Sequence, residues 1–344
     1  MIIVAYSGFF SVCVAFMVIA FRPAYREWRM PTDCQPLPVS KCYTRHTGHF
    51  AEAFRHEILS SLAASPEACT GLFEPVPMHA ERMDWEKATR PLIAFHALRL
   101  QRSVKCAVPL YVNADLHSIG HDTFSGLFAA GHVHLGPHSE LREWAHAEGW
   151  LTLGVSCVAL RRVSSALAIE LKNRCCFERL HAPTIYFGAA YRGTASRGHT
   201  DGVLHSFESV PGAIRRSDSL FMVQGNCVLP RHRRFAGSLI VTGHLVVGAY
   251  TIVEGDIKAR KGLSLGSESI VTGSVVSEGD IKLFHRARVG GVVISEQKVI
   301  IGTGAEIGTI DQPSTISAEA IIVEAGVIAH GTVWARDVGT VWSS

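Results

Sequence analysis

The sequence predicts an all-β fold, a parallel β-helix with 18 residues in each coil. The first observation is a fixed repeat, because four successive 18-residue blocks begin at Gly237, Gly255, Gly273 and Gly291. The second is that aliphatic and polar residues alternate within each block, as they do along a strand with one buried face. The third is that no helical stretch separates these short strands. One coil cannot bury its own apolar face, so the coils are expected to stack on one another.

Corresponding positions of the four blocks carry the same kind of side chain, which indicates where that side chain points. Four columns are aliphatic and are expected to face the core: Leu239, Ile257, Val275 and Val293; Leu245, Leu263, Ile281 and Val299; Val247, Leu265, Leu283 and Ile301; Val253, Val271, Val289 and Ile307. A fifth column is small throughout and is expected at a tight corner: Thr251, Ser269, Ala287 and Ala305. The alternative fold is an antiparallel sandwich of short strands, which rarely keeps one period in register through four units.

The same frame extends towards the N-terminus. Residues 125–178 form three earlier blocks with matching inward columns: Val133, Leu151 and Ile169; Leu135, Leu153 and Leu171; Ser139, Cys157 and Cys175. We therefore expect a first β-helix portion at 107–188, a second at 227–336 and a tail at 337–344. Residues 189–202 are polar and rich in glycine. The range 189–226 is thus expected to be a mobile insertion in one solenoid, or else a linker between two.

The chain begins with an uncharged apolar run that is long enough to span a bilayer as a helix. Residues 1–21 are therefore predicted to be a transmembrane anchor. Its main apolar side chains are Ile2, Ile3, Val4, Phe9, Phe10, Val14, Phe16, Val18, Ile19 and Phe21. Arg22, Arg26 and Arg29 follow the run, so the positive-inside rule places the rest of the chain in the cytoplasm. The alternative, a cleaved signal peptide, needs a basic residue before the run and a small-residue cleavage site after it.

A tether and a helical segment are expected between the anchor and the coils. Residues 22–45 include a proline-containing stretch that is typical of an extended tether. Phe50, Phe54, Ile58 and Leu62 then recur every four residues, which predicts a helix with one apolar face over residues 47–64. We expect this helix, within a helical and capping segment at 46–106, to cover the open end of the first coil, because terminal coils need a cap. The alternative is a helix that binds a partner protein.

Composition argues against several classes of function. The formal net charge is +3 and charged residues make up 18% of the chain, so no basic surface for nucleic acid is expected. The nine cysteines follow no CxxC spacing. Cys157 and Cys175 are expected to be small apolar filler in one inward column, with a disulfide as the alternative. The sequence holds no P-loop, nucleophile elbow, zinc-protease motif or paired carboxylates, so no cofactor and no small-molecule substrate are expected.

Histidine is the one abundant reactive residue. Of the 18 histidines, six lie close together in the sequence: His117, His121, His132, His134, His138 and His146. His132 and His134 flank Val133, which is expected to point inward, so both are expected to point outward. No Asp, Glu or Cys completes a recognisable metal-ligand spacing, and a solvated face is therefore expected rather than a metal site.

An enzymatic alternative follows from the same spacing. Three columns of the repeat lie six residues apart, the period from which hexapeptide acyltransferases build a left-handed β-helix. Such enzymes use one histidine as a general base between subunits, and the candidates here are His244, His285 and His330. The fifth and sixth columns fit that family poorly: Val241, Ala259, Ser277 and Ser295; Thr242, Arg260, Glu278 and Glu296. We therefore expect no enzymatic activity.

One stretch of the second portion resembles a known family. Residues 253–273 contain an aliphatic-x-Gly-Asp-Ile-x-Ala motif followed by aliphatic-x-aliphatic-Gly, and residues 276–283 are a looser copy. In this they resemble bactofilins, polymer-forming cytoskeletal proteins of bacteria, and the resemblance covers about residues 235–335. It implies a right-handed parallel β-helix that joins end to end and associates with the inner membrane through an N-terminal segment. The chain departs from the family in its extra coils and its long insertion.

The function expected from these features is a scaffold anchored once in a bacterial inner membrane. It would associate with itself through the ends of the β-helix and recruit partner proteins on the cytoplasmic side. The last coil of a β-helix exposes an unpaired strand edge, which must be blocked or used. The candidate self-association contacts are Phe284, Val333, Trp334, Val341 and Trp342. The last four could instead cap that end, and Phe284 could instead be a corner residue packed by a neighbouring loop. The alternatives are a capped monomeric solenoid that serves a membrane complex, and the acyltransferase.

Overall fold

The computed structural model describes positions 10, 13, 14, 16–19, 21, 22 and 25 and the ranges 47–64, 71–80, 83–189 and 203–342. The chain divides into two compact units, residues 1–46 and residues 47–344. Of the expected anchor residues, Phe10, Val14, Phe16, Val18, Ile19 and Phe21 are helical and exposed, whereas Ile2, Ile3, Val4 and Phe9 lie outside the described residues, as does most of the expected tether. Within the described positions, no helix has the length and apolar character needed to cross a membrane.

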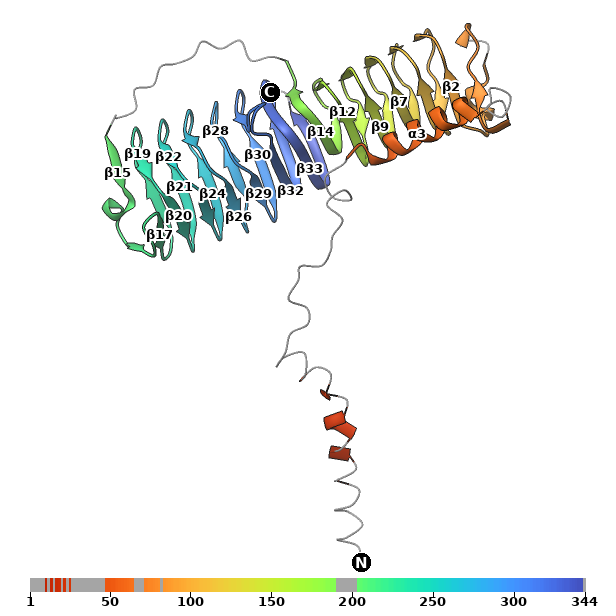
Figure 1. Ribbon diagram of the computed structural model, residues 1–344. Coiled ribbons are helices and arrows are strands. Elements are labelled where there is room, and N and C mark those ends of the chain that lie inside the picture. The colour runs from red at the N-terminus through yellow and green to blue at the C-terminus, as the bar shows by residue number, and fades with distance from the viewer. Residues whose placement is uncertain are drawn as a thin grey trace, which may run out of the picture. The chain divides into compact units, whose positions relative to one another are not determined.

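The second unit is a parallel β-solenoid of about 14 coils, arranged in two stacks (Figure 1). The first stack contains β1(Glu74–Pro75), β2(Leu92–Ala94), β3(Leu98–Leu100), β4(Lys105–Cys106), β5(Leu110–Val112), β6(Leu116–Ser118), β7(Thr123–Ala129), β8(Val133–Leu135), β9(Glu140–Ala147), β10(Trp150–Leu153), β11(Val158–Ala159), β12(Arg162–Ser165), β13(Ala168–Leu171) and β14(Cys176–Phe187). The second stack contains β15(Leu204–Ser206), β16(Ala213–Arg215), β17(Leu220–Val223), β18(Cys227–Leu229), β19(Arg234–Ala236), β20(Ser238–Val241), β21(His244–Val247), β22(Ile252–Glu254), β23(Ile257–Ala259), β24(Gly262–Leu265), β25(Ile270–Val271), β26(Val275–Ser277), β27(Ile281–Leu283), β28(Arg288–Val289), β29(Val293–Ser295), β30(Lys298–Ile301), β31(Glu306–Ile307), β32(Ser314–Glu324) and β33(Val327–Trp342). The remaining elements are α3(His49–Ala64), η2(Trp85–Lys87) and η3(Phe207–Ser209).

The columns read from the sequence are the inward ladders of the stacks. Leu239 pairs with Ile257, which pairs with Val275 and then Val293, and the other three aliphatic columns pair in the same way. Each step is one coil, a rise of about 4.8 Å along the stack. The side chains of these four columns are at most 2% exposed. The predicted all-β solenoid with 18 residues per coil is therefore confirmed for this portion.

Each coil of the first stack contributes to three parallel sheets. One side, which we call the helix face, consists of β2, β5, β7, β9, β12 and β14. The second side, which we call the groove face, consists of β3, β6, β8, β10, β13 and the last residues of β14. The third side consists of β4, β7, β9, β11 and the start of β14. The longer strands β7, β9 and β14 bend around a corner and so serve more than one side.

One corner of several successive coils in each stack has a left-handed backbone residue that is not glycine. These residues are His121, His138, Ser156 and Arg174 in the first stack and His232, Tyr250, Glu268 and Arg286 in the second. The backbone N–H of His121 donates to the carbonyl of Pro137 at 2.8 Å, and that of Tyr250 to the carbonyl of Ser267 at 2.9 Å. In the second stack the small column directly follows Tyr250, Glu268 and Arg286, and in the next coil it follows Gly304, which is also left-handed. Thr251, Ser269, Ala287 and Ala305 are at most 1% exposed, as a tight corner requires.

The coils extend beyond the expected boundaries. The first stack begins with β1 at Glu74, inside the segment expected to be helical and capping. The second stack begins with β15 at Leu204 rather than near residue 227, and the expected tail at 337–344 belongs largely to β33. Irregular first and last coils explain the differences, because residues 74–106 and 204–226 lack the full column pattern that identifies the regular coils.

Helix α3 lies along the side of the first stack rather than over its end (Figure 1). The expectation of an end cap is wrong for this helix. Phe54 is 8% exposed and Ile58 is fully buried. They pack on a row of outward residues from three successive coils: Ile93, Tyr111 and Phe128. These side chains point away from the core of the stack and are apolar, so the helix is the element that removes them from water.

His146 extends the same outward row beneath the first turns of α3. Its Nδ1 lies 2.9 Å from Ser164 Oγ, and its ring stacks on Phe128 with centroids 5.5 Å apart. Burial lowers the pKa of His146, and the charges of Arg55 and His181 lower it further, while Glu148 and Glu52 act in the opposite direction. The neutral imidazole is therefore the form that the docked helix favours.

We expect helix α3 to detach more readily as pH falls. The pKa of His146 is lowered in the docked state and returns towards about 6.5 when the site opens. Below about pH 6.5 the open state therefore binds more protons than the docked state. The docking of α3 is most favourable above that pH and becomes weaker as pH falls. Hydrogen exchange of the α3 amides, corrected for intrinsic rates, measures this. His146→Gln should abolish the pH dependence, and an equal loss of protection in that variant would contradict the assignment.

Candidate functional site

Four of the five expected self-association residues lie on β33, which pairs with β14 of the same chain. The pairing is antiparallel and covers all three sides of the last coil of each stack, from Cys176 with Thr340 to Phe187 with Val327. Val333 and Val341 are at most 1% exposed. The edge of the last coil is thus occupied within the chain, so these two valines are not surface contacts.

The aromatic candidates have different surroundings. Trp334 is partly exposed, and the guanidinium carbon of Arg179 lies 5.2 Å from its ring centroid across the junction. Trp342 is 61% exposed at the end of β33, and Phe284 is 49% exposed on the side of the second stack. Phe284 therefore stands on a lateral surface and not at an end. Trp342 and Phe284 are the members of the set whose rings are open to a partner.

Aromatic side chains close the core at the outer end of each stack. Trp85 of η2 is 4% exposed, and its Nε1 donates to the carbonyl of Ala80 at 3.2 Å. At the other end, Phe207 of η3 is fully buried and stacks on Phe235 with ring centroids 4.9 Å apart. β16 pairs antiparallel with β17 and covers its outer edge. Local sequence reasoning missed these plugs because neither aromatic falls on the 18-residue lattice.

The histidines proposed for the acyltransferase alternative do not come together. His330 is 7% exposed, and its Nδ1 donates to the carbonyl of Pro183 at 3.0 Å inside the junction. Thr184 Oγ1 lies 3.2 Å from the same nitrogen. His244 is exposed in β21 and His285 follows β27, both in the second stack. No cleft that the structure describes combines these three side chains.

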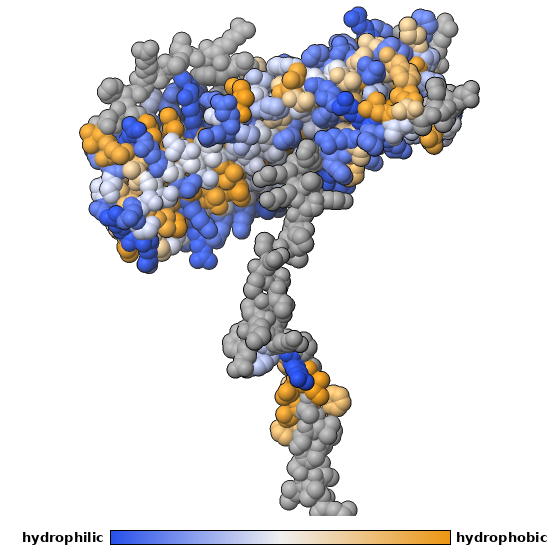
Figure 2. Space-filling model, viewed as in Figure 1, coloured by the Kyte–Doolittle hydropathy of each residue, from blue (hydrophilic) through white to orange (hydrophobic). Residues whose placement is uncertain are grey.

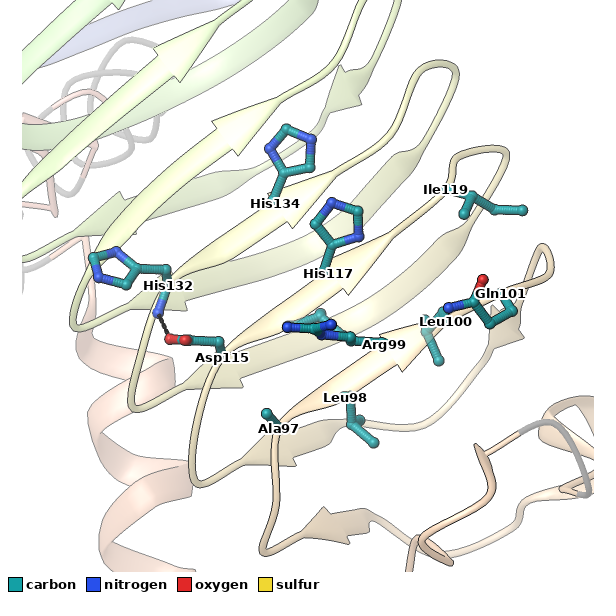
Figure 3. A pocket seen from close by; sticks show the side chains of 11 residues that line it. Ala97, Leu98, Arg99, Leu100, Gln101, Asp115, His117, Ile119, His132 and His134 are labelled. Carbon is teal, nitrogen blue, oxygen red and sulfur yellow. Dashed lines mark hydrogen bonds between the residues drawn. The ribbon is translucent and has the colours of Figure 1, made fainter.

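The histidine-rich region forms a groove on the groove face of the first stack (Figure 3). The cavity has a volume of about 520 Å³ and is lined by Ala97, Leu98, Arg99, Leu100, Gln101, Asp115, Leu116, His117, Ile119, His132 and His134. Arg99 pairs with His117 and His117 with His134, so these three residues form one outward row on successive coils. Each row position lies between two buried residues that fix the strand and hold the outward side chain in place: Leu98 and Leu100, Leu116 and Ser118, and Val133 and Leu135.

The rim of this groove is fixed by hydrogen bonds from one coil to the next. Asp115 Oδ1 accepts from the backbone N–H of His132 at 2.7 Å, and His132 Nδ1 accepts from the backbone N–H of Trp150 at 3.0 Å (Figure 3 shows the first). Asp115 and the Nδ1 of His132 therefore hold the backbone of this corner in place from one coil to the next. Because its Nδ1 is an acceptor, neutral His132 carries its proton on Nε2. The prediction that His132 and His134 point outward is correct.

Two pairs of histidines stack between coils with nearly the same geometry. The ring centroids of His117 and His134 are 4.8 Å apart, and those of His121 and His138 are 4.9 Å apart. The first pair lies in the groove and the second lies at the left-handed corner. Burial lowers the pKa of His134, and the charges of His117 and Lys172 lower it further while Glu170 raises it. No group of three potential metal ligands is found in the described part of the chain.

A second cavity, of about 400 Å³, lies where the groove face meets the junction. Its lining comes from both stacks: Trp150, Glu170, Tyr186, Phe187, Gly188, Gly304, Gly326, Val327 and Ile328. The rings of Trp150 and Tyr186 are nearly parallel, with centroids 5.9 Å apart. Glu170 forms an ion pair with Lys172. One side of the first stack thus carries these two cavities, one lined by Arg99 and histidines towards the outer end and an aromatic one at the junction.

The family resemblance rests on a corner of the second stack. Gly255 and Asp256 lie between β22 and β23, where Asp256 Oδ1 accepts from the backbone N–H of Ser274 at 2.7 Å. A Cβ at Gly255 would meet the carbonyl oxygen of Gly237 at 2.3 Å, so the motif serves the turn of the coil. No protein-family model matches the chain, and searches of curated proteins and of solved structures found no similar chain.

Proposed function

We propose that this chain is a non-enzymatic scaffold built from a solenoid that is closed at both ends. An apolar N-terminal segment would hold it at a membrane, and its long sides would bind partner proteins. This combines the expected membrane scaffold with the capped, monomeric alternative. Unlike the function expected from the sequence, the proposed function does not include self-association of separate chains through the ends of the solenoid.

The observation that carries the proposal is the junction between β14 and β33. End-to-end growth of a β-helix requires a free strand edge over an uncovered apolar core. The inner edges of both stacks are used against each other. Trp85 and Phe207 cover the core at the outer ends. The outermost strands are also short, β1 having two residues and β15 three, which limits what an incoming edge could pair with.

The lateral surfaces supply the area for partners. Figure 2 shows polar residues over much of the visible face of the second unit, with smaller apolar groups between them. Phe284, Val228 and Val246 are exposed apolar residues on the sides of the second stack. The groove on the first stack adds a concave polar site. A solenoid with long accessible sides and closed ends fits a recruiting platform better than a filament subunit. The bactofilin resemblance fits this proposal if the contact between subunits has become a contact between two stacks of one chain.

The proposal is tested by the size of the particles. Residues 47–344 form one compact unit and should give discrete monomers in sedimentation velocity and negative-stain electron microscopy at every salt concentration. The full chain should require detergent or lipid to reach the same state, because of its N-terminal segment. Filaments of residues 47–344 would overturn the closed-end proposal. Trimers would favour the acyltransferase alternative, and a full chain that behaves the same with and without detergent would overturn the membrane tether.

A further inference from the structure

Three cationic or protonatable side chains in the groove have no polar partner in the described structure. The row consists of Arg99, His117 and His134, all exposed and all lining the 520 Å³ cavity. Apart from the stacking of the two imidazoles on each other, no hydrogen bond or ion pair within the described residues engages these side chains. Some surface arginines of the second stack are paired with a carboxylate one coil away, as Arg260 is with Glu278 and Arg288 with Glu306.

The carboxylates near the row do not neutralise it. Asp115 is engaged with the backbone N–H of His132 at the rim. Glu170 forms its ion pair with Lys172, whose own charge lowers the pKa of His134. His117 faces His134 from the preceding coil and disfavours a second positive charge there. Within the described residues, the groove therefore holds the charge of Arg99 without a paired carboxylate, next to the imidazoles of His117 and His134.

We propose that this groove binds a phosphate-type oxyanion, with Arg99, His117 and His134 as the ligand-binding residues. Arg99 would supply a permanent charge and the planar donor fork that suits phosphate oxygens. The two imidazoles would add charged N–H donors from the next two coils, at intervals of about 4.8 Å. The cavity is larger than one phosphate group and falls in the size range of small-molecule sites, so it has room for the organic part of a phosphate monoester.

Anion binding is linked to protonation of His134. A bound dianion favours the imidazolium form, so it raises the pKa of His134 and offsets the effects that disfavour charge on that ring. Affinity should therefore increase as pH falls from about 7.5 to about 5.5. Phosphate itself loses charge over this range, since its second pKa is about 6. Sulfate keeps its double charge, so its affinity isolates the protein's contribution to the pH dependence.

The test is calorimetry and NMR on residues 47–344 with inorganic phosphate and with sulfate. Arg99→Gln and the double variant His117→Gln/His134→Gln should each weaken binding by about tenfold or more at about pH 6. The matched control is His121→Asn/His138→Asn, which removes the other stacked pair at the corner, where asparagine tolerates the left-handed backbone. This control should bind like the parent chain. In the parent, saturating sulfate should shift the imidazole titration of His134 to higher pH.

A second arm distinguishes a free ligand from a lipid headgroup. Vesicles of phosphatidylcholine with and without phosphatidic acid, whose headgroup is a phosphate monoester, are sedimented with residues 47–344 and with the same range carrying each variant, so that the apolar N-terminal segment is absent. Binding to free anions without vesicle binding assigns a soluble phosphate ester. Vesicle binding that needs phosphatidic acid and is lost with Arg99→Gln assigns the headgroup. The proposal is overturned if neither probe binds, or if the corner control loses binding as strongly as the groove variants. Neither result bears on the closed ends, which the particle-size experiment tests separately.

Discussion

Replacing Val271 by aspartate is expected to unfold the second stack locally and to lower the free energy of unfolding by several kcal/mol, on the order of 4. Val271 is fully buried and lies between Val253 and Val289 on the same inward ladder. A carboxylate there would lose its hydration and face aliphatic side chains in the coils above and below. Because each coil is stabilised by its neighbours, the damage should spread to adjacent coils. Urea unfolding followed by circular dichroism measures the change.

The matched control is Ile270→Asp, one residue earlier on the same strand. Ile270 points outward, is only partly buried and pairs with Arg288 in the next coil. An aspartate there stays hydrated and lies opposite a guanidinium, so the expected loss is within about 1 kcal/mol. If the two variants unfolded at the same urea concentration, the assignment of inward and outward positions would be wrong. The comparison is sharp because one residue separates the two sites.

The regular coils could be predicted from the sequence because equivalent positions of successive coils have the same surroundings. A position such as Leu263 must fill the same space as Leu245 and Ile281, so the same kind of residue returns every 18 positions. The left-handed corners were not predicted. Their residues, among them His138, Tyr250 and Arg286, share a backbone conformation and no side-chain type. The signal that remained was the small residue that follows each corner in the second stack.

The position of α3 illustrates what periodicity leaves undetermined. The apolar face of the helix was evident from Phe54 and Ile58, yet its binding surface was not. That surface is made by Tyr111 and Phe128, outward residues that stack on each other with centroids 5.1 Å apart. Aromatic residues on an otherwise solvated row were the available signal. The junction is harder still, because β14 and β33 are distant in sequence and pair antiparallel, outside the parallel lattice.

The groove could be predicted in part. The cluster of histidines and their outward direction followed from the alternation around Val133. The sequence did not predict that His117 and His134 lie in one row with Arg99, because a coil of irregular length separates Arg99 from the regular blocks. The first regular block begins at residue 125, and the coils before it could not be placed in register from the sequence. Strand pairing places all three side chains on adjacent coils.

The junction should be opened by one change, Gly339→Val. Gly339 pairs with Phe177, and a Cβ at this position would lie 2.2 Å from the Phe177 ring. That ring is 1% exposed and packs on Phe187, so it has little room to move. Overpacking of this kind costs about 1–3 kcal/mol, and here the cost falls on the contact between the stacks while each stack keeps its own ladder. The variant should therefore melt in two steps in scanning calorimetry, with the parent melting in one.

Opening the junction should also change how the chain associates. The freed edges of β14 and β33 would be long and unpaired, which is the condition that favours pairing with another chain. Sedimentation velocity of Gly339→Val should show dimers or larger species that increase with concentration. Thr340→Val is the control, because it alters the next residue of β33, which pairs with Cys176, at nearly constant side-chain volume. A Gly339→Val protein that stays monomeric and melts like the parent would mean that the junction is not what prevents the stacks from associating with other chains.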